Sequence, residues 1–307
     1  MTGRLSMAKK RIDVSLVIIN YNGFEVTRDL LRSIFKADKG ELGLEIVVVD
    51  NASEDDSFKK LKQGFGKKAG VKLVRKPKNN FLAEAFNYGF KFSAGKIVVF
   101  MSNDLEVNKK WLVELVKGFD DDEVGIVGVA LLVFQDKRKV DCLGCNLDWF
   151  LYGKRLETGK KFKKRAGVGV VDFVSGSVVG VRRELFIKAG KFDDMYGGNY
   201  EDVDLALRIR KLGYKVVVVY KSIVYHRGSW TVDRHVGNVN SSYLCRRNRL
   251  ATMIKNYPRF KLILVIPVYL CLQLGLLVKE LVIDRQVRLA MTGVRAVGWN
   301  VSHLMYY

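Results

Sequence analysis

The sequence predicts an α/β fold, in which a doubly wound, mixed but mainly parallel sheet is flanked by helices and followed by a helical, membrane-proximal extension. Three observations lead to this prediction. Continuous apolar runs that end in a polar residue recur through the first third of the chain, and such runs are typical of strands buried on both faces. Helical segments alternate with them. After about residue 240 the chain becomes both basic and apolar.

The predicted parallel strands are the runs VSLVIIN (14–20), LEIVVVD (44–50) and KIVVFMSND (96–104). They end in Asn20, Asp50 and Asp104 respectively. In doubly wound sheets, ligands bind beyond the carboxyl ends of the strands. We therefore expect these three polar ends to line one crevice.

Helices are expected between the strands. The first covers roughly 25–36, where Val26, Leu30 and Ile34 recur at four-residue spacing. The second starts after NASEDDS, where Ser53 can act as the N-cap, and the third covers roughly 82–93. A further strand is expected at 124–134. The segment DFVSGSVVGVRRELFIKAG then predicts a strand, a turn and a short helix that ends at Gly190. A helix at 201–212 and a strand at 214–220 follow.

The charge balance restricts the class of partner. Among 307 residues, 53 Lys and Arg outnumber 32 Asp and Glu, and the net charge is +21. Such a chain favours nucleic acid, anionic lipid or phosphorylated substrates, and charge alone does not choose among them. The segment KRLETGKKFKKR (154–165) holds seven basic residues and one acid. It is interpreted either as a solvated loop or edge hairpin, or as a site of anion steering.

The cysteines and the first residues indicate the compartment. Of the four cysteines, only those of CLGC (142–145) are close in sequence, and no second Cys or His pair follows at zinc-finger spacing. A metal site is therefore not expected there, and reduced cysteines are. The basic tail, residues 1–12, lacks the apolar segment of a secretory signal.

The last part of the chain, 241–307, predicts a helical segment that associates with a membrane. Its run LILVIPVYLCLQLGLLV (262–278) has 17 residues and Gln273 as its one strongly polar member, whereas a spanning helix needs about 20. Ten Lys and Arg accompany two acids, Glu280 and Asp284. A basic and apolar tail suits an interfacial helix on an anionic membrane. The alternative is a core helix packed on the main domain.

The stretch GGNYEDVDLALRIRKLGY (197–214) places three acids in four positions of a very basic chain. Ordinary helix construction accounts for Asp204, which lies four residues before Arg208, and for Gly213 as the helix end. It does not require Glu201 and Asp202. These two acids are therefore candidates for chemistry.

Read in order, seven motifs resemble those of glycosyltransferase family 2, most nearly its rhamnosyltransferase-like members. The motifs are SLVIINYNG, IVVVDNASEDDS, NNFLAEAFNYGF, VVFMSNDLEV, SGSVVGVRRELFIKAGKFDD, YEDVDLALRIRKLGYKV and YHRGS. The resemblance covers about residues 13–230. It implies a GT-A fold over 13–240, a nucleotide-diphosphate sugar as donor, and inverting transfer to an acceptor hydroxyl.

The resemblance also implies roles for individual residues. Asp202 matches the general base, with Glu201 as the fallback base or a ligand of acceptor hydroxyls. Asp104 matches the aspartate that binds a divalent metal, Mg²⁺ or Mn²⁺, and His226 matches a histidine that approaches the metal or the diphosphate. The nucleotide sugar is assigned to five residues: Asn20, Asp50, Asn79, Asn103 and Arg227. The physics agrees, since a metal stabilises the charge that develops on the leaving diphosphate and a carboxylate can take the acceptor's proton.

Two positions depart from the family pattern. Ser102 stands where relatives often have Asn, which removes one amide. Phe81 stands where the pattern usually has Gly, so a bulky residue there can reshape the loop, and the contact from Asn79 is less firmly implied than the others.

The expected acceptor is a membrane-associated glycan or a lipid-linked molecule, and the expected location is the cytoplasmic face of the cell membrane. Two alternatives compete with this assignment. The charge suggests a non-enzymatic protein that binds nucleic acid or anionic surfaces. The sequence contains no recognisable nucleic-acid-binding module, however, and we do not expect nucleic acid as a partner. A nucleotidyltransferase would need a glycine-rich phosphate loop, and IINYNGFE has one glycine.

Overall fold

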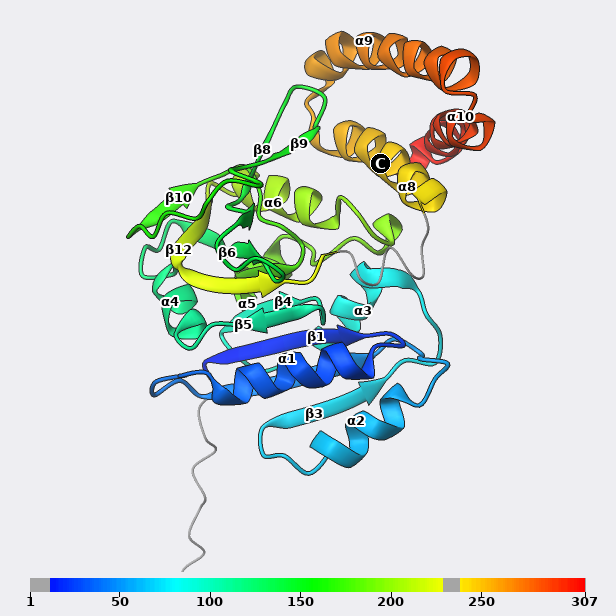
Figure 1. The fold of residues 1–307 in the computed structure, drawn as a ribbon. Helices are drawn as coiled ribbons and strands as arrows, with labels where there is room; N and C mark the ends of the chain where they lie inside the picture. The colour runs from blue at the N-terminus through cyan, green and yellow to red at the C-terminus, as the bar shows by residue number, and fades with distance from the viewer. Residues whose placement is uncertain (1–11, 229–237, 307) are drawn as a thin grey trace, which may run out of the picture.

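The computed structural model describes residues 12–228 and 238–306. Most of the basic tail and Ser229 at the end of the YHRGS motif therefore lie outside the described residues. The fold is α/β with one large mixed sheet (Figure 1), as predicted.

The sheet has ten strands in the order β10-β12-β6-β11-β4-β1-β2-β3, with β5 beside β12 and β7 beside β6. Strands β4, β1, β2 and β3 are parallel to one another, and β12 is parallel to β6. Strand β11 runs antiparallel between β4 and β6 and makes the sheet mixed. The strand bounds are β1 Val14–Asn20, β2 Leu44–Asp50, β3 Val71–Arg75, β4 Ile97–Met101, β5 Leu105–Val107, β6 Val124–Val133, β7 Val140–Cys142, β10 Val168–Val170, β11 Val178–Arg182 and β12 Lys215–His226.

A separate two-stranded sheet, β8 (Cys145–Leu147) and β9 (Gly153–Arg155), precedes most of the basic segment 154–165. Only Lys154 and Arg155 of that segment lie in the hairpin, and the other residues are mostly exposed turn and loop, as the solvated-loop interpretation predicts. In this part of the chain, β7 to β10 are short strands of three residues each.

Helices flank the large sheet. Their bounds are α1 Phe24–Lys36, α2 Ser57–Phe65, α3 Phe81–Phe90, α4 Trp111–Lys117, α5 Arg183–Lys188 and α6 Glu201–Lys211. Between sheet and helices lies one continuous apolar core that reaches from β1 to β12. The packed rings of α3 and its neighbours form part of it: Phe86, Phe90, Phe100, Phe186 and Phe192.

The chain ends in three long helices. They are α8 (Asn238–Asn256), α9 (Arg259–Val278), which continues into a π-helical turn at Lys279–Ile283, and α10 (Val287–Ser302). Figure 1 shows them grouped at one end of the molecule, beside α6 and β8–β9 and far from β2 and β3. The prediction of a C-terminal helical extension is confirmed.

One local prediction is wrong. Ser53 does not cap the second helix, which begins at Ser57 with Asp56 as its N-cap. The Ser53 hydroxyl instead donates to Asp50 Oδ1 at 2.6 Å. The strand-end carboxylate competes for the hydroxyl, and the helix starts four residues later.

Candidate active site

The polar ends of β1 and β2 meet at one edge of the sheet, as predicted. Asn20 is completely buried. Its side-chain amide donates to Asp50 Oδ1 at 2.8 Å and to Ser53 Oγ at 3.1 Å, and its oxygen accepts from Thr27 Oγ1 at 2.8 Å. All of its polar atoms are therefore used inside the protein, and Asn20 holds the strand ends together.

Asp50 is buried in the same network. Its second oxygen accepts from the Ser53 backbone N–H at 3.1 Å and lies 3.2 Å from Arg75 Nε. The Arg75 side chain is half exposed. Asp50 is thus fixed beside a cation that can meet an approaching anion.

Asn103, beyond the end of β4, joins this network from the other side. It is buried, and its amide donates to Thr27 Oγ1 at 2.9 Å. Thr27 therefore links Asn103 to Asn20. The carboxyl ends of three parallel strands are held together by one continuous hydrogen-bonded network.

Asp104 faces His226, the last residue of β12. Oδ2 of Asp104 lies 3.5 Å from Nε2 of His226, and Nδ1 of the same ring lies 2.7 Å from Asp141 Oδ2. Burial lowers the pKa of His226, but hydrogen bonds to the two carboxylates outweigh it and raise this pKa to about 9. Burial raises the pKa of Asp104, yet the hydrogen bond and charge of His226 bring it below its usual value.

The Asp104 and His226 pair fits a divalent cation. Asp104 would supply a carboxylate oxygen, and His226 would ligate the ion through Nε2 after losing its proton, since only the neutral imidazole binds a metal. Asp141 holds the far nitrogen of the ring, in the manner that orients metal-ligating histidines. Within residues 12–228 and 238–306, no group of three His, Cys, Asp or Glu side chains surrounds a common centre, so substrate oxygens and water would complete the coordination.

Arg227 lies next to this pair. Its backbone N–H donates to the Asp104 carbonyl at 2.9 Å. Its guanidinium lies 3.3 Å from Asp29 of α1 and 4.1 Å from the centre of the Phe134 ring, while Nε is buried and makes no hydrogen bond. The arginine is therefore held at the rim of the site with one donor unused.

Asn79 is brought to the strand ends through Asn51. Its side-chain oxygen accepts from Asn51 Nδ2 at 2.9 Å and from the Phe81 N–H at 3.0 Å. Phe81 has a φ of +68°, in the left-handed region, and its ring is 54% exposed. This conformation explains the glycine of the family pattern, since glycine adopts it without steric cost. Here a phenylalanine is held in it.

The two unexplained acids begin helix α6. Glu201 is buried, and its Oε2 makes no hydrogen bond. Asp202 is partly exposed, and its Oδ2 accepts from the Gly176 N–H at 2.8 Å. Burial raises the pKa of both carboxyl groups, and the charge of Asp202 raises that of Glu201 further.

Gly176 shows how this acid pair is built. A Cβ at this position would lie 3.1 Å from Asp202 Oδ2 and 3.3 Å from Glu201 Oε1. A glycine therefore lets the backbone approach both carboxyl groups. The same turn is anchored to the other wall, because the Ser102 N–H donates to the Ser177 carbonyl at 3.0 Å. One three-residue turn thus connects Asp202 with the segment that carries Asp104.

Asp204 has the structural environment predicted for it. It is completely buried and lies 2.6 Å from Arg208 Nη2. Lys255 Nζ at 3.2 Å and Asn256 Nδ2 at 2.9 Å, both from α8, complete its shell. Asp204 therefore fastens α6 to α8.

The loop before the acids is held by α8. Asn248 is completely buried, and its amide nitrogen lies 2.7–2.9 Å from three carbonyl oxygens, those of Tyr196, Gly198 and Asn199. Asn199 and Tyr200 have φ values of +64° and +71°. Two consecutive non-glycine residues in this region indicate a loop that its surroundings constrain.

Several residues of the site were not identified from the sequence. They are Thr27, Arg75, Asp141, Gly176 and Asn248. Asp141 precedes Cys142 on a short strand, and no pattern marked it. Gly176 is the glycine of SGS, at the start of one of the seven motifs, and a glycine between two serines can indicate a close approach of the backbone.

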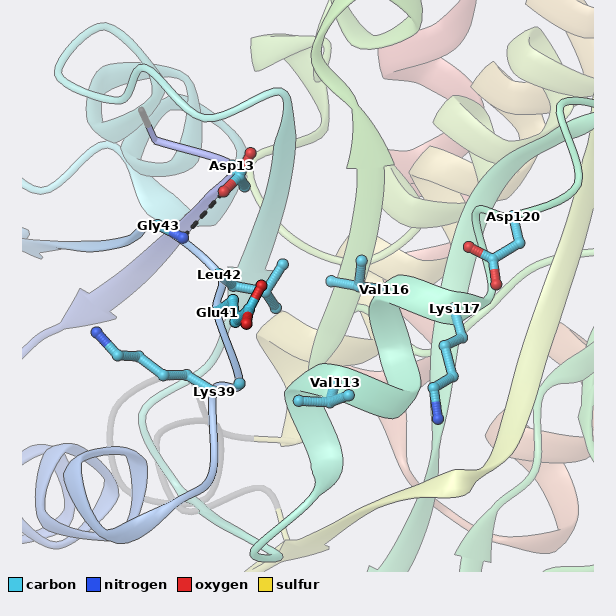
Figure 2. A pocket seen from close by; sticks show the side chains of 10 residues that line it. Asp13, Lys39, Glu41, Leu42, Gly43, Val113, Val116, Lys117 and Asp120 are labelled. Atoms are coloured by element: carbon cyan, nitrogen blue, oxygen red, sulfur yellow. Dashed lines mark hydrogen bonds between the residues drawn. The ribbon is translucent and has the colours of Figure 1, made fainter. Parts of the chain in front are cut away.

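A depression elsewhere on the molecule does not belong to this site. It is lined by residues that include Asp13, Lys39, Gly43, Val113 and Lys117, and Figure 2 shows Asp13 hydrogen-bonded to Gly43 within it. Asp13 and Gly43 precede β1 and β2. The depression thus lies at the amino ends of these strands, opposite the edge where the polar residues converge.

Comparisons with known proteins bear on the family and on the fold. Residues 15–190 match the model of glycosyl transferase family 2. A dolichol-phosphate mannosyltransferase of Pyrococcus furiosus is 38% identical over 116 residues, which cover 36% of this chain and 32% of that protein. The O-antigen biosynthesis protein RfbC of Myxococcus xanthus is 27% identical over 222 residues, 70% of this chain and 17% of that protein. The chain spans half or less of the length of the curated relatives that it matches.

Two solved structures share the fold. GalNAc-T7, solved with UDP, GalNAc and Mn²⁺, superposes with a TM-score of 0.65 and 20% identity over 80% of this chain and 48% of that chain. The mannosyltransferase PcManGT from Pyrobaculum calidifontis, in complex with GDP-Man and Mn²⁺, gives 0.60 and 18% over 95% and 76%.

Proposed function

Since this chain belongs to glycosyl transferase family 2, we propose that it is an inverting, metal-dependent glycosyltransferase that acts on a glycan or lipid-linked acceptor at a membrane. The observation that carries the proposal is the single turn, residues 175–177, that contacts Asp202 on one side and the β4 end on the other. This contact supports a site in which Asp202 and the end of β4 act on the same substrate.

Asp202 is the general base in this proposal, and Glu201 supports it. A base must reach its substrate in the ionised form. Asp202 is partly exposed and is oriented by the Gly176 N–H, whereas Glu201 is buried with an unpaired oxygen, and burial favours its neutral form. A neutral Glu201 leaves Asp202 as the carboxylate that takes the acceptor's proton.

The donor's diphosphate is assigned to the opposite wall. Asp104 and His226 would hold the divalent metal, and Arg227 and Arg75 supply positive charge nearby. GalNAc-T7 and PcManGT were both solved with Mn²⁺ and with a nucleotide or nucleotide sugar, which supports this assignment. When bound, the metal stabilises negative charge on the departing diphosphate.

The buried network has a positioning role. Asn20, Asn103 and Thr27 use their polar atoms on one another, and Asp50 is tied to Ser53. We assign them to shaping the nucleotide-binding edge, with Asp50, Asn51 and Asn79 nearest to the nucleotide. The unpaired oxygen of Asn51 is available as an acceptor there.

Membrane association is supported by helix α9, most of whose apolar side chains are exposed. Its buried residues are Val265, Tyr269 and Gln273, whereas Ile263 and Leu264 are 73% and 66% exposed. Arg259–Ile283 is long and apolar enough to cross a membrane, with a mean hydropathy of 2.2, and only 11% of its most apolar window is buried. The alternative of a core helix does not fit this exposure.

Helix α10 also has an apolar outer surface. Its buried residues are small or polar, Ala290, Thr292, Ala296 and Asn300, and its exposed ones include Val287, Met291 and Val301. An apolar outer surface is stable in contact with lipid. We therefore place the enzyme on a membrane surface that faces its cytoplasmic supply of donor.

The function is tested by nucleoside diphosphate release from a panel of UDP-, GDP- and dTDP-sugars with Mn²⁺. At least one donor should be turned over, and turnover should stop with excess chelator and in Asp104→Asn. Failure with every donor would contradict the enzyme assignment. Full turnover in chelator would contradict the role of Asp104.

A further inference from the structure

Three arginines close together on α8 differ in how their charge is balanced. Arg246 Nη2 lies 2.5 Å from the buried Glu280. Arg247 Nη2 donates to the carbonyls of Met195 and Tyr196, at 2.8 Å each. Arg249 is just as buried, at 7% exposure, yet its Nε and Nη1 make no hydrogen bond.

Arg249 has no carboxylate partner in the part of the chain that the structure describes. Burying an unpaired cation is costly, and buried charges are normally paired. The arginine is also not at the surface, where water would solvate it. An unbalanced, buried guanidinium with two free nitrogens indicates that its partner is a ligand.

The surroundings of Arg249 are aromatic and hydroxyl-rich. Its guanidinium carbon lies 3.6 Å from the centre of the Tyr152 ring and 6.0 Å from that of Tyr269. Gln273 donates to the Tyr152 hydroxyl at 3.3 Å. Tyr152 is 40% exposed, so the cluster reaches the surface there. Stacking keeps the guanidinium in place and leaves its edge for hydrogen bonds.

This cluster lies between the acid pair and the apolar helix. Tyr200, the residue before Glu201, packs against the apolar cluster that contains Leu250 of α8 and Tyr269 of α9. On the other side, Tyr269 and Gln273 belong to α9, whose outer face is exposed and apolar.

We propose that Arg249, with Tyr152 and Gln273, binds the phosphoryl group that joins an acceptor glycan to its lipid. This inference rests on the proposed function and names the substrate class. A planar guanidinium recognises phosphate oxygens with two parallel hydrogen bonds. The lipid would lie along α9 and α10, and the sugar hydroxyl would extend from the phosphate toward Asp202.

The test is equilibrium binding of farnesyl diphosphate to the full chain in detergent, by calorimetry and in chelator so that the metal-dependent donor site is silent. Inorganic diphosphate and farnesol are the comparison ligands. The wild type should bind farnesyl diphosphate more tightly than either. If farnesol binds as tightly as farnesyl diphosphate, the phosphoryl group is not recognised. If inorganic diphosphate binds as tightly, the lipid is not recognised. Either result would overturn the proposal.

Variants assign the binding to one residue. Arg249→Gln should weaken farnesyl diphosphate binding about tenfold or more, the usual effect of losing a charge-assisted hydrogen bond, and Arg249→Lys should restore part of it. Arg32→Gln removes an exposed arginine of α1, outside the proposed lipid site, and should bind as the wild type does. If Arg249→Gln is folded and binds normally, or if Arg32→Gln weakens binding equally, the proposal is wrong.

Folding and function are separated by two further measurements. The melting temperature of wild type should rise with farnesyl diphosphate, and that of Arg249→Gln should not, although both proteins melt cooperatively. Arg249→Gln should still release nucleotide from the donor in the presence of water alone. If the wild type turns over no donor, the proposed function is refuted. If the wild type turns over donor but Arg249→Gln binds farnesyl diphosphate as tightly as wild type, only this inference is refuted.

Discussion

Three acids occupy the first turn of helix α6, and the structure gives each a different environment. Asp204 is paired with Arg208 and Lys255. Asp202 is held by the Gly176 N–H and remains partly exposed. Glu201 is buried with one unpaired oxygen. An aspartate thus fixes helix packing at position 204 and, in our proposal, accepts a proton at position 202.

The environment of Glu201 predicts a pH-dependent cost in stability. A carboxyl group whose pKa is raised in the folded state makes its full contribution to stability at pH values below its unfolded pKa, about 4.3. This contribution to stability is lost as pH rises through the folded pKa. Glu201→Gln removes the titration. The free energy of unfolding of this variant should match that of wild type at about pH 4.3 and exceed it by of order 1 kcal/mol at about pH 8. Melting temperatures measured at both pH values report this difference. A constant difference across this range would contradict a raised pKa.

At single positions, sequence reasoning was most successful where chemistry follows a strand. The prediction that Asn20, Asp50 and Asp104 share one edge follows from parallel strands having common carboxyl ends. It did not identify Thr27 or Asp141, because their importance arises from tertiary contacts with residues 76 and 85 positions away in the sequence. A hydrogen-bond partner of this kind leaves no local pattern.

At the scale of elements, the start of α3 carries backbone strain. Phe81 has a left-handed φ of +68° and an exposed ring, and its neighbour Leu82 donates to the Gly197 carbonyl of the acid loop at 2.8 Å. The donor-side turn and the acid loop are therefore joined. A residue with a Cβ pays about 1 kcal/mol for this conformation.

Phe81→Gly should therefore stabilise the protein by about 0.5–1 kcal/mol, because glycine adopts a positive φ without steric cost. Phe81→Ala is the matched control, since it removes the same ring and keeps the Cβ. Denaturant unfolding of both variants gives the difference. If alanine is as stable as glycine, the strain assigned to this turn is absent.

Helix α8 is the element that the sequence described least well. Its polar residues were interpreted as part of a membrane-proximal tail, but Asn248 and Arg247 hold the loop before the acids, and Asn256 holds Asp204. Periodicity predicts that such a helix exists. It does not predict which buried carbonyls the helix will satisfy, because those belong to a loop about 50 residues earlier in the chain.

For the whole molecule, the fold class followed from the alternation of apolar runs and helices, and the placement of the C-terminal helices did not. The length of the run at 262–278 was too short to decide between a core helix and a membrane helix. The exposure of most apolar side chains of α9 supports the membrane helix that we propose, and Val265, Tyr269 and Gln273 are the residues that it buries. This arrangement is invisible in a hydropathy profile.

The apolar outer face predicts binding to lipid vesicles. Ile263→Glu combined with Leu274→Glu should abolish flotation with anionic vesicles, since each change places a charge on the exposed apolar face of α9. The melting temperature should not fall, because neither side chain is buried. Ile187→Glu, at an exposed site on α5, should float as wild type does. Equal loss in the α5 variant, or retained flotation in the α9 variant, would contradict this orientation.

The central claim, that Asp202 is the proton acceptor of a glycosyltransferase site, is tested most directly by Asp202→Asn. Turnover of the nucleotide sugar should fall roughly 10²- to 10⁴-fold, the range for loss of a general base, while donor binding and melting temperature remain near wild type. Asp204→Asn provides the contrast, because it breaks a buried pair and should lose about 2 kcal/mol or more of stability. Near-normal turnover by folded Asp202→Asn would contradict the account.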